Sequence, residues 1–509
     1  MKVIGRLIKK TTEIGFKRIN RKQLSYRNQL DVLMALLKKA QNTELGFYHG
    51  FKNLLVNRDV VSKFQDEVPI MDYEEFHSRW LHKALKGQSD CVWPGKIKYY
   101  ALSSGTTGSP SKRIPVTMDM IRSFQRSSIR QYSVLHALDL DEHFFSASGL
   151  AVGGTTRLKK SNQHVEGDLS GILKKHTTLL IRPMTKPGDR IASLSDWNEK
   201  LNRMVEKAPS WNIGIVAGIP SWCLMLMERI VEEHNLTSIH DIWPNFRVYV
   251  HGGVYMDPYV ARLQKICKQE VFLFDTYLAS EGYFGFQIHP DQPGMKLLIN
   301  NGIFFEFIPF DSRYFNEEGE LISQYKALSI SEVKENVDYA LVISTNAGLW
   351  RYLIGDLVRF IDVEDYRIVI SGRIKQFLSL CGEHLSLDNI NHAFQSLLEQ
   401  GFLTHSEFTI VADKEAMLHH WFIESDPQEN DPTKLLKGLD ERLGELNDDY
   451  YSARKYSLKE PKITLLKPGT FYAYMQSLGK ISRAYRSSLE FSVSYSFTKK
   501  SLFKNSKIK

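Results

Sequence analysis

The segment from Ser103 to Lys112 has the composition of an anion-binding loop. It reads Ser-Ser-Gly-Thr-Thr-Gly-Ser-Pro-Ser-Lys and follows Ile97–Leu102, whose isoleucine, leucine and tyrosines are typical of a β-strand. Backbone N–H groups, hydroxyls and an ammonium group are able to hold a phosphate, and glycine lets the backbone approach it closely. The segment therefore predicts a phosphate site, although a flexible polar turn would have the same composition.

The residues after this loop distinguish it from the Walker loop. A Walker loop runs through Gly-Lys-Ser/Thr directly into a helix. Here Lys112 is followed by Arg-Ile-Pro-Val, and Pro115 lacks the N–H that a helix interior uses. We therefore expect a second strand after Lys112, so that the loop joins the two strands of a β-hairpin.

A second group of polar residues follows the predicted strand Val271–Phe274. The segment Asp275–Gly282 offers hydroxyls, an aromatic ring and a carboxylate, on Thr276, Tyr277, Ser280 and Glu281. Ligands of parallel sheets bind where the strands end. An aromatic ring there can stack on a base, a hydroxyl can bind a phosphate, and a carboxylate can hold Mg²⁺. An ordinary capped turn is the alternative for this segment taken alone.

Two later patches carry groups suited to a ribose or a phosphate. The first ends at Asp356, whose carboxylate can accept two hydrogen bonds from a diol. An ordinary turn aspartate, paired with Arg351 or Arg359, is the alternative. The second patch, Ser371–Lys375, contains Arg373, whose guanidinium can reach ribose or phosphate oxygens. A solvated basic turn is the alternative there.

The size and charge of the chain limit the classes of protein that it can represent. At 509 residues it exceeds one ordinary core, so we expect two or more domains. Its 43% apolar and 24% charged residues are typical of a globular protein. Much of the net charge of +8 lies in the first 22 residues and the last 11. The basic start can contact an anionic membrane surface or form a solvated helix face, and no evenly basic groove for nucleic acid is evident.

The cysteines and the apolar runs indicate the compartment. The four cysteines lack the spacing of a metal site, and this favours a reducing environment: Cys91, Cys223, Cys267 and Cys381. Residues 1–22 lack the apolar run of a signal peptide. No stretch approaches the roughly 20 apolar residues of a membrane span. We therefore expect a cytoplasmic protein.

The order of predicted elements indicates an α/β and α+β multidomain fold. Apolar strands alternate with helices over Ile213–Phe274, which predicts βαβ units and a mostly parallel sheet. Asn300–Gly302 is a hairpin signal between Met295–Ile299 and Ile303–Ile308. Four short strands of a β-meander are then expected at Tyr339–Ser344, Leu349–Ile354, Asp356–Ile361 and Tyr366–Ser371.

The remaining elements complete the expected architecture. Asp72 and Thr117 are candidate caps of helices over Tyr73–Leu85 and Met118–Leu138. From residue 376 onward, two helices bracket two strands in a small α+β module. We expect a large N-terminal domain over residues 1–374, with mixed sheets, flanking helices and the meander. A small mobile α+β cap with a basic tail would occupy residues 375–509.

Taken in order, these motifs resemble those of the adenylate-forming superfamily, which includes acyl-CoA synthetases, luciferases and peptide-synthetase adenylation domains. Ser104–Pro110 followed by Lys112 is similar to the phosphate signature of that superfamily. Within it, the chain looks most like the auxin-responsive-promoter acyl-acid-amido synthetases, the Gretchen Hagen family. The resemblance spans about residues 40–375 well and the C-terminal part poorly. Its further points are Val68-Pro69 with Tyr73-Glu74, Trp93-Pro94, Lys112–Val116, Tyr277 with Ser280-Glu281, Tyr283–Gly285, and Tyr352 with Gly355-Asp356.

The resemblance implies ATP and Mg²⁺ as cofactors and gives roles to the polar residues. Lys112 would neutralise phosphate charge, Tyr277 would lie on adenine, and Asp356 would take the ribose hydroxyls with help from Arg373. Glu281 would bind Mg²⁺. The nucleotide site would be completed by Ser103, Ser104, Gly105, Thr106, Thr107, Thr276 and Ser280.

Further positions carry over from the family. Gly252 and Gly253 would line the nucleotide and acyl pocket, and Lys375 matches the position where the C-terminal domain pivots. Lys480 is the candidate for a C-terminal lysine that reaches the α-phosphate, with a surface lysine as the alternative. Ala279 occupies a position that is often serine, a change that should matter little. Candidate walls of the acyl pocket, or else ordinary core residues, are Ser148, Leu150, Gly218, Pro220 and Trp222.

The implied reaction joins a small carboxylic acid to an amine. ATP would convert the carboxylate into an acyl-adenylate with release of pyrophosphate, and an amine, expected to be an amino acid, would displace AMP. An acyl-CoA ligase on the same scaffold remains open, as does a non-catalytic protein that binds nucleotide or a membrane. The residues do not identify the acid or the amine.

Overall fold

The structure is a computed structural model, and it describes most of the chain. The described residues are 2–21, 25–103, 112–153, 155–177, 181–253, 256–316, 319–322, 325–374, 387–403, 407–413, 416–425 and 430–477, with Leu378, Leu380, Glu383 and Leu385. They fall into two units. The first comprises residues 1–103, 111–253 and 264–370, and the second comprises 104–110, 254–263 and 371–509. The expected domain boundary after residue 374 stays a prediction.

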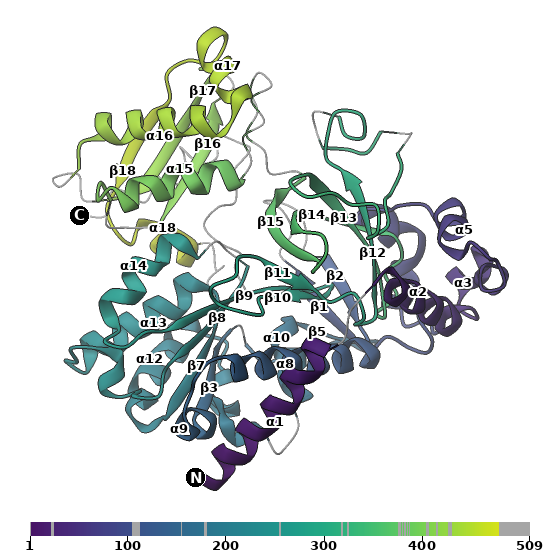
Figure 1. Ribbon diagram of the computed structural model, residues 1–509, viewed down its shortest axis with the longest axis horizontal. Coiled ribbons are helices and arrows are strands. Elements are labelled where there is room, and N and C mark those ends of the chain that lie inside the picture. The colour runs from purple at the N-terminus through teal and green to yellow at the C-terminus, as the bar shows by residue number, and fades with distance from the viewer. Residues whose placement is uncertain are drawn as a thin grey trace. The chain divides into compact units, whose positions relative to one another are not determined.

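An eleven-stranded sheet runs through the first unit (Figure 1). Its strand order is β12-β13-β14-β15-β11-β10-β9-β8-β7-β3-β6. The strands are β3 (Ser148–Val152), β6 (Thr185–Lys186), β7 (Ile213–Gly218), β8 (Val248–His251), β9 (Phe272–Ala279), β10 (Gly282–Phe286), β11 (Met295–Leu297), β12 (Ile303–Pro309), β13 (Asp338–Thr345), β14 (Tyr352–Asp362) and β15 (Arg367–Arg373).

One half of this sheet is parallel, as the alternation of strands and helices predicts. β6, β3, β7, β8 and β9 run in the same direction. Helices α13 (Pro220–Glu233) and α14 (Asp257–Ile266) make the crossovers, and Pro220 stands at the start of α13, where its missing N–H costs nothing. The βαβ units are therefore confirmed, and they bring the ends of β8 and β9 to the same edge.

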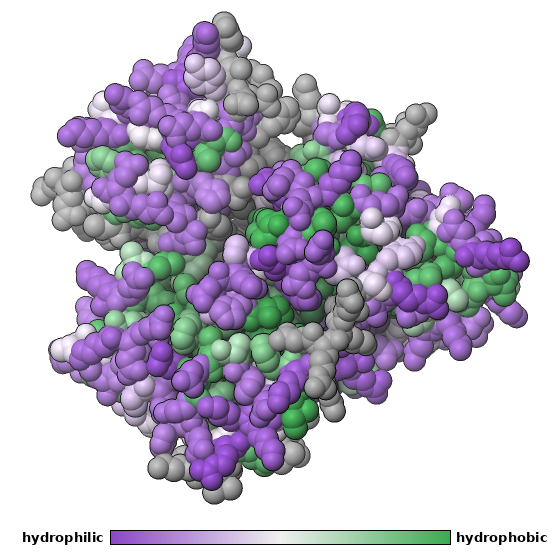
Figure 2. All heavy atoms as spheres, viewed as in Figure 1, coloured by the Kyte–Doolittle hydropathy of each residue, from purple (hydrophilic) through white to green (hydrophobic). Residues whose placement is uncertain are grey.

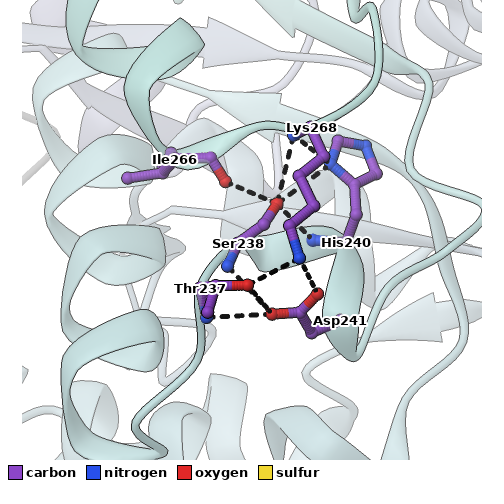
Figure 3. Close-up of polar contacts among 6 residues, drawn as sticks. All are labelled: Thr237, Ser238, His240, Asp241, Ile266 and Lys268. Carbon is purple, nitrogen blue, oxygen red and sulfur yellow. Dashed lines mark hydrogen bonds and ion pairs between the residues drawn. The ribbon is translucent and has the colours of Figure 1, made fainter.

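The loop before β8 is tied to the end of α14 by a compact set of polar contacts (Figure 3). The buried Ser238 hydroxyl donates to the Ile266 carbonyl at 3.0 Å and accepts the Lys268 backbone N–H at 3.1 Å. The Lys268 ammonium donates to Asp241 at 2.8 Å and to Thr237 at 2.5 Å. These contacts join the segment before β8 to the segment between α14 and β9.

The other half of the sheet is antiparallel, and it corrects two predictions. The hairpin at Asn300–Gly302 is wrong, because β11 pairs with β10 and β15 while β12 pairs with β13. The turn signal is real, since Gly302 has φ +81°, but it does not choose the partners of the flanking strands. The two strands expected on either side of Gly355 are one strand, β14, whose pairing shifts register there.

A smaller sheet carries the predicted phosphate hairpin. β1 (Tyr99–Ser103) pairs antiparallel with β2 (Lys112–Val116), so that Ser103 lies opposite Lys112 and the hairpin is confirmed. β5 (Val165–Gly167) and β4 (Lys159–Lys160) complete this sheet. The loop residues 104–111 lie outside the described residues.

The first unit also contains the helices that accompany its sheets. Both predicted caps are confirmed: the Asp72 side chain accepts the N–H of Glu75, and the Thr117 hydroxyl accepts that of Met120. Beyond α8 the chain continues in a short 3₁₀ turn, Leu135–Ala137, so the predicted helix ends slightly early. The helices are α1 (Lys2–Arg21), α2 (Tyr26–Ala40), α3 (Glu44–Tyr48), α4 (Phe51–Leu54), α5 (Val60–Glu67), α6 (Tyr73–Phe76), α7 (His82–Leu85), α8 (Met118–Val134), α9 (Glu142–Ser146), α10 (Leu169–Lys175), α11 (Asp189–Ala192) and α12 (Trp197–Lys207).

The second unit is the α+β module that the sequence predicts. Strands β16 (Phe408–Asp413) and β17 (Leu418–Glu424) are antiparallel, and β18 (Lys462–Leu466) runs parallel to β17. Around them lie α15 (Leu387–Glu399), α16 (Pro432–Leu446), α17 (Asp448–Tyr456) and α18 (Thr470–Ser477). Phe394, Trp421 and Leu439 belong to a hydrophobic core of its own. Across the described part of the chain, every helix is too short or too polar to cross a membrane.

Candidate active site

The base of the hairpin is joined to helix α6. The Tyr73 hydroxyl accepts the backbone N–H of Arg113 at 2.8 Å. The Lys112 ammonium lies 5.4 Å from the centre of the Tyr73 ring, which is within the range of a cation–π contact. Ser103 is half-buried on the opposite strand. Lys112 is therefore held beside an aromatic ring, while Ser104, Gly105, Thr106 and Thr107 lie outside the described residues.

A buried tyrosine, Tyr352, links Tyr73 to the two candidate carboxylates. Burial raises the pKa of its hydroxyl well above the ordinary value, and the negative charges of Glu281, Asp72 and Asp356 raise that pKa further. Glu281 and Asp356 therefore lie within electrostatic range of the same hydroxyl. Among the described groups that oxygen has no hydrogen-bond partner.

The most direct contact between two predicted site residues joins Tyr277 to Asp356. The Tyr277 hydroxyl donates to Asp356 Oδ2 at 2.7 Å, and the two residues are 2% and 3% exposed. The Tyr277 ring packs 4.7 Å from that of Phe284. Just before Asp356, Gly355 adopts φ +91°, where glycine is favoured, at the register shift of β14.

The alternative explanation of Asp356 as a turn aspartate paired with an arginine is wrong. The guanidinium of Arg351 binds Glu306 through bonds of 3.0 and 3.1 Å and donates to the carbonyls of Gln65 and Val68. Arg359 binds Asp338 through two bonds of 2.9 Å. Both arginines have structural partners, and Tyr277 bonds to Asp356 instead.

Two hydrogen bonds in series connect Thr276 on β9 to Gln131 on helix α8. The Thr276 hydroxyl donates to the Tyr283 hydroxyl at 3.0 Å, which in turn donates to the side-chain oxygen of Gln131 at 2.5 Å. Burial raises the pKa of Tyr283 well above its ordinary value, so the hydroxyl stays a donor. A Cβ on Gly252 would lie 2.3 Å from the Thr276 carbonyl oxygen, so only glycine fits where β8 ends.

His251 lies at the same edge, directly before the two glycines. Its Nδ1 is 3.5 Å from Asp275 Oδ1, and burial lowers its pKa to about 4. A group with that pKa is a neutral imidazole at physiological pH. Gly253 follows with φ +82° and open space around its Cα.

The candidate acyl-pocket residues lie on neighbouring elements of the parallel half, but Ser148 is opposite Ile213 at the start of the strands, whereas Gly218 and Pro220 are at the other end. β3 pairs with β7, with Leu150 opposite Val216 and Val152 opposite Gly218. Leu150 and Pro220 are buried, which favours the core alternative for these two. Trp222 is half-buried, with its ring 4.3 Å from that of Trp197. Ser148 begins β3.

The structure thus brings several predicted residues together and leaves others apart. Tyr277 binds Asp356 directly, Lys112 lies beside the Tyr73 ring, and the charges of Glu281 and Asp356 both raise the pKa of Tyr352. Thr276 and Tyr277 are neighbours on β9, with Gly252 against Thr276, and Ser280 is half-buried in the following turn. Arg373 ends β15 within the second unit, and Lys375 and Lys480 lie outside the described residues.

Three residues of this site were not given a role from the sequence. Tyr73 and Tyr352 were noted only as points of family resemblance, and their buried hydroxyls could not be foreseen. Gln131 carries no motif, because a glutamine within a helix is usually solvated. Its contact with Tyr283 depends on how α8 packs against β10.

Models of one protein family match most of the chain. The GH3 family N-terminal domain matches residues 25–156 and 154–272, the central domain matches 296–371, and the C-terminal domain matches 387–485. The last match covers the region where motifs alone resemble the family poorly.

Individual relatives and solved structures agree with these matches. The jasmonoyl–L-amino acid synthetase JAR4 of Nicotiana attenuata is 32% identical over 367 residues, which are 58% of this chain and 60% of that protein. The chain spans 46% and 44% of the length of two other curated relatives. It therefore covers between two fifths and three fifths of these relatives.

Two solved structures share the fold. The GH3.15 acyl acid amido synthetase superposes with a TM-score of 0.73 at 19% identity and covers 94% of this chain and 93% of its own. A 2-hydroxyisobutyryl-CoA ligase, solved after adenylation, gives a TM-score of 0.59 at 14% identity and covers 86% and 85%. These likenesses confirm the expected architecture.

Proposed function

The chain belongs to the GH3 family, and from that premise we propose that it is an ATP-dependent ligase that adenylates a carboxylic acid and transfers the acyl group to an amine. The observation that carries the proposal is the buried contact of the Tyr277 hydroxyl with Asp356 at 2.7 Å. An amino acid is the proposed amine, because one similar protein is a jasmonoyl–L-amino acid synthetase.

The nucleotide would be held by segments that are far apart in the sequence. Ser103–Thr107 would offer hydroxyls and backbone N–H groups to the phosphates, and Lys112 would supply positive charge there. Asp356, oriented by Tyr277, would accept hydrogen bonds from the ribose hydroxyls with Arg373 assisting, and Tyr277 would lie on adenine. Thr276, Ser280, Gly252 and Gly253 would form the remaining wall. The open space at Gly253 supports this arrangement.

The donor set at Glu281 fits Mg²⁺ in the way that nucleotide sites bind it. The described residues hold no group of three or more His, Cys, Asp or Glu side chains that would form an all-protein metal site. Mg²⁺ usually takes only one or two carboxylates and obtains its other ligands from phosphates and water. Glu281 is a buried carboxylate and could be that ligand. A bound ion would neutralise part of the phosphate charge.

The reaction follows from the charges of its partners. One oxygen of the acid's carboxylate attacks the α-phosphorus of ATP, and the bond to pyrophosphate breaks. Lys112, the hairpin N–H groups and Lys480 would stabilise the negative charge that develops on the phosphates. The amine nitrogen then attacks the acyl carbon, loses a proton, and AMP leaves with the electron pair of the broken C–O bond.

The acid would bind where β3, β7 and the start of α13 meet. Trp222 is the side chain best placed to form a wall, because it is half-buried and its partner Trp197 holds its ring. Gly218 ends β7 just before α13 begins, and Leu150 and Pro220 would support the wall from the core. Ser148, at the opposite end of β3, would lie farther from this wall. Lys375 would be the pivot of the C-terminal cap. Three unpaired thiols, Cys91, Cys223 and Cys267, support the proposed cytoplasmic location.

The similarity to a CoA ligase keeps a thioester product as the second candidate. ATP–pyrophosphate exchange with a panel of carboxylic acids tests adenylation, and supplying amino acids or CoA then separates an amide from a thioester. We expect exchange with at least one acid and amide formation afterwards. A chain that exchanges nothing would be a binding protein.

Two variants test the site itself. Asp356→Ala and Lys112→Ala should each lower the exchange rate by about 100-fold or more, as expected when a positioned charge is lost. Asp338→Ala is the matched control, since that carboxylate pairs with Arg359 on a neighbouring strand. Unchanged exchange in both site variants would reject the proposed nucleotide site.

A further inference from the structure

A cavity of about 350 Å³ lies in the first unit, where α1, α8 and strands β10 and β11 meet (Figure 1). Its volume lies within the range of small-molecule sites, roughly 300–1,000 Å³. Much of its wall is apolar and is formed by Ile19, Ile129, Phe286, Ile288, Leu297 and Leu298. Figure 2 shows hydrophobic side chains reaching the surface in the area of β10 and β11. An apolar group would be able to enter here.

This cavity is separate from the proposed nucleotide and acyl sites. None of the residues assigned to ATP, Mg²⁺ or the acid lines it. Helix α8 turns Gln131 toward Tyr283, whereas Arg126 and Arg130 of the same helix line the cavity. The nearest link is the Phe286 ring, 6.1 Å from that of Tyr283.

The wall formed by α1 is closely fitted. A Cβ on Gly15 would lie 2.3 Å from the Ser133 hydroxyl oxygen and 2.8 Å from its Cβ, so glycine allows α1 to approach α8 closely. Gly5 makes a similar approach to the Glu142 carbonyl, at 2.1 Å. The two contacts fix the helix along its length, and the cavity between α1 and the sheet is therefore a shaped site.

The cationic groups of the cavity differ in whether they have an acidic partner. Arg126 and Arg130 stand four residues apart on α8, where like charges repel. Arg130 donates to the Asn300 side-chain oxygen at 2.8 Å, and Arg126 donates to the Ser123 hydroxyl at 2.8 Å. Burial and the charge of Arg126 both lower the pKa of Arg130. Within the part of the chain that the structure describes, Lys296 is the one cation of this cavity with an acidic partner, Asp365.

Negative charge is missing from the described wall. No aspartate or glutamate lines the cavity, and among the residues that the structure describes no carboxylate forms an ion pair with Arg126 or Arg130. Arg130 is half-buried and Arg126 is exposed. A half-buried guanidinium such as that of Arg130 gains most from a carboxylate, which it can bind through two hydrogen bonds. The cavity thus combines an apolar wall with two cations that lack a counter-ion.

We propose that this cavity binds an amphiphilic monocarboxylate of medium chain length. Its carboxylate accepts hydrogen bonds from Arg126 and Arg130, and its chain packs on Ile129, Phe286 and Ile288. The site is independent of the ligase proposal: a ligand held here lies outside the residues assigned to catalysis and is not activated.

The position of the ligand is the direct test. Crystals of the full chain soaked in 10-bromodecanoate should show bromine by anomalous diffraction between α1, α8 and β10–β11. Bromine near Trp222 alone would mean that the acid occupies the acyl site, and would overturn the proposal while supporting the ligase. Bromine at neither position would overturn the proposal and leave adenylation to be judged by the exchange assay.

Variants test the recognition in solution by calorimetric titration with decanoate. Arg126→Gln/Arg130→Gln should weaken binding about tenfold or more, because two charge-assisted hydrogen bonds are lost. Arg122→Gln, one turn earlier on α8 and outside this cavity, is the matched control. Decanol should bind much more weakly than decanoate. Equal binding of the two ligands, or of the double variant and the parent, would refute the proposal.

A second variant, at an exposed position, separates a loss of binding from a loss of folding. Ile129 is 62% exposed, so Ile129→Glu should leave the thermal unfolding midpoint close to that of the parent while placing a carboxylate beside the arginines. We expect it to abolish decanoate binding and to leave ATP–pyrophosphate exchange unchanged. Retained binding in this folded variant would contradict the proposed head-group contact.

Discussion

At the residue scale, the position of Asp356 depends on two neighbours of different kinds. Gly355 supplies a left-handed backbone conformation, φ +91°, at an irregularity of β14. Tyr277 supplies a hydroxyl from a residue 79 positions away. The residue type at 356 points to a ribose site from sequence alone. Its partner could not be predicted, because the contact depends on a sheet that brings β9 and β14 into one unit.

Removing the Tyr277 hydroxyl tests this contact. In Tyr277→Phe, the buried carboxylate of Asp356 loses a hydrogen bond of 2.7 Å, and a loss of this kind costs about 1–3 kcal/mol. We expect the free energy of unfolding in urea to fall by that amount and the KM for ATP to rise. Tyr48→Phe, at an exposed position, is the control and should change neither quantity. A variant as stable as the parent would show that the bond contributes little.

The buried imidazole of His251 makes stability depend on pH. Burial lowers its pKa from 6.5 to about 4, so the unfolded chain binds a proton more readily than the folded one between those values. The stability that this group contributes is fully present above pH 6.5 and declines as the pH falls toward 4, by about 3 kcal/mol in total. Denaturant unfolding of the parent and of His251→Gln at pH 7 and pH 4.5 measures it. The variant should lose less stability on acidification, and equal losses would contradict the assignment.

At the element scale, pairing decides what local signals leave open. The hairpin of β1 and β2 is predictable because strand, polar loop and strand follow one another directly. The turn at Asn300–Gly302 looks equally convincing, yet β11 and β12 take different partners. Local residues set a turn, whereas the partner of a strand depends on the apolar surface that each face must cover. Elements joined by short, regular connections are therefore the ones that sequence reasoning recovers.

The edge where β8 and β9 end gives another example of a contact that the local sequence does not predict. The pair Gly252-Gly253 is visible in the sequence, but the reason for Gly252 is not. A side chain at 252 would meet the Thr276 carbonyl at 2.3 Å, a contact made by two segments that share a sheet edge. The glycine is needed for packing between strands, whichever ligand the edge binds.

Gly252→Ala therefore tests the geometry of this edge. The added methyl would push β9 away from β8 and displace Thr276 and Tyr277, at a cost of about 1–3 kcal/mol for overpacking. We expect a lower unfolding midpoint and a markedly lower exchange rate. Gly149→Ala is the matched control in strand β3 of the same parallel half, because a Cβ there meets no atom within 4 Å. If both variants behave alike, the close approach at Gly252 does not constrain the site.

At the scale of the whole molecule, each unit has its own means of stabilisation. The first unit holds a buried ion pair in which Arg351 joins Glu306 on β12 to two carbonyls at the C-terminal end of α5. The second unit has a separate hydrophobic core that includes Leu439, Trp421 and Phe394. The sequence predicts both units from the change in element order, but it does not predict the return of residues 254–263 to the second unit. That segment belongs there through contacts such as the bond from the Tyr259 hydroxyl to Glu407 at 3.2 Å.

Separate cores predict that the two units unfold in separate steps. Domains with their own cores are not bound to one cooperative transition, so differential scanning calorimetry of the full chain should show two. Arg351→Met leaves Glu306 buried without its cation, which costs about 3–5 kcal/mol, and should lower only the transition of the first unit. Leu439→Ala removes core volume at a cost of about 2–5 kcal/mol and should lower only the other. Arg359→Met, which breaks a half-exposed pair, should shift either midpoint little. A single transition that both core variants lower together would mean that the units fold as one.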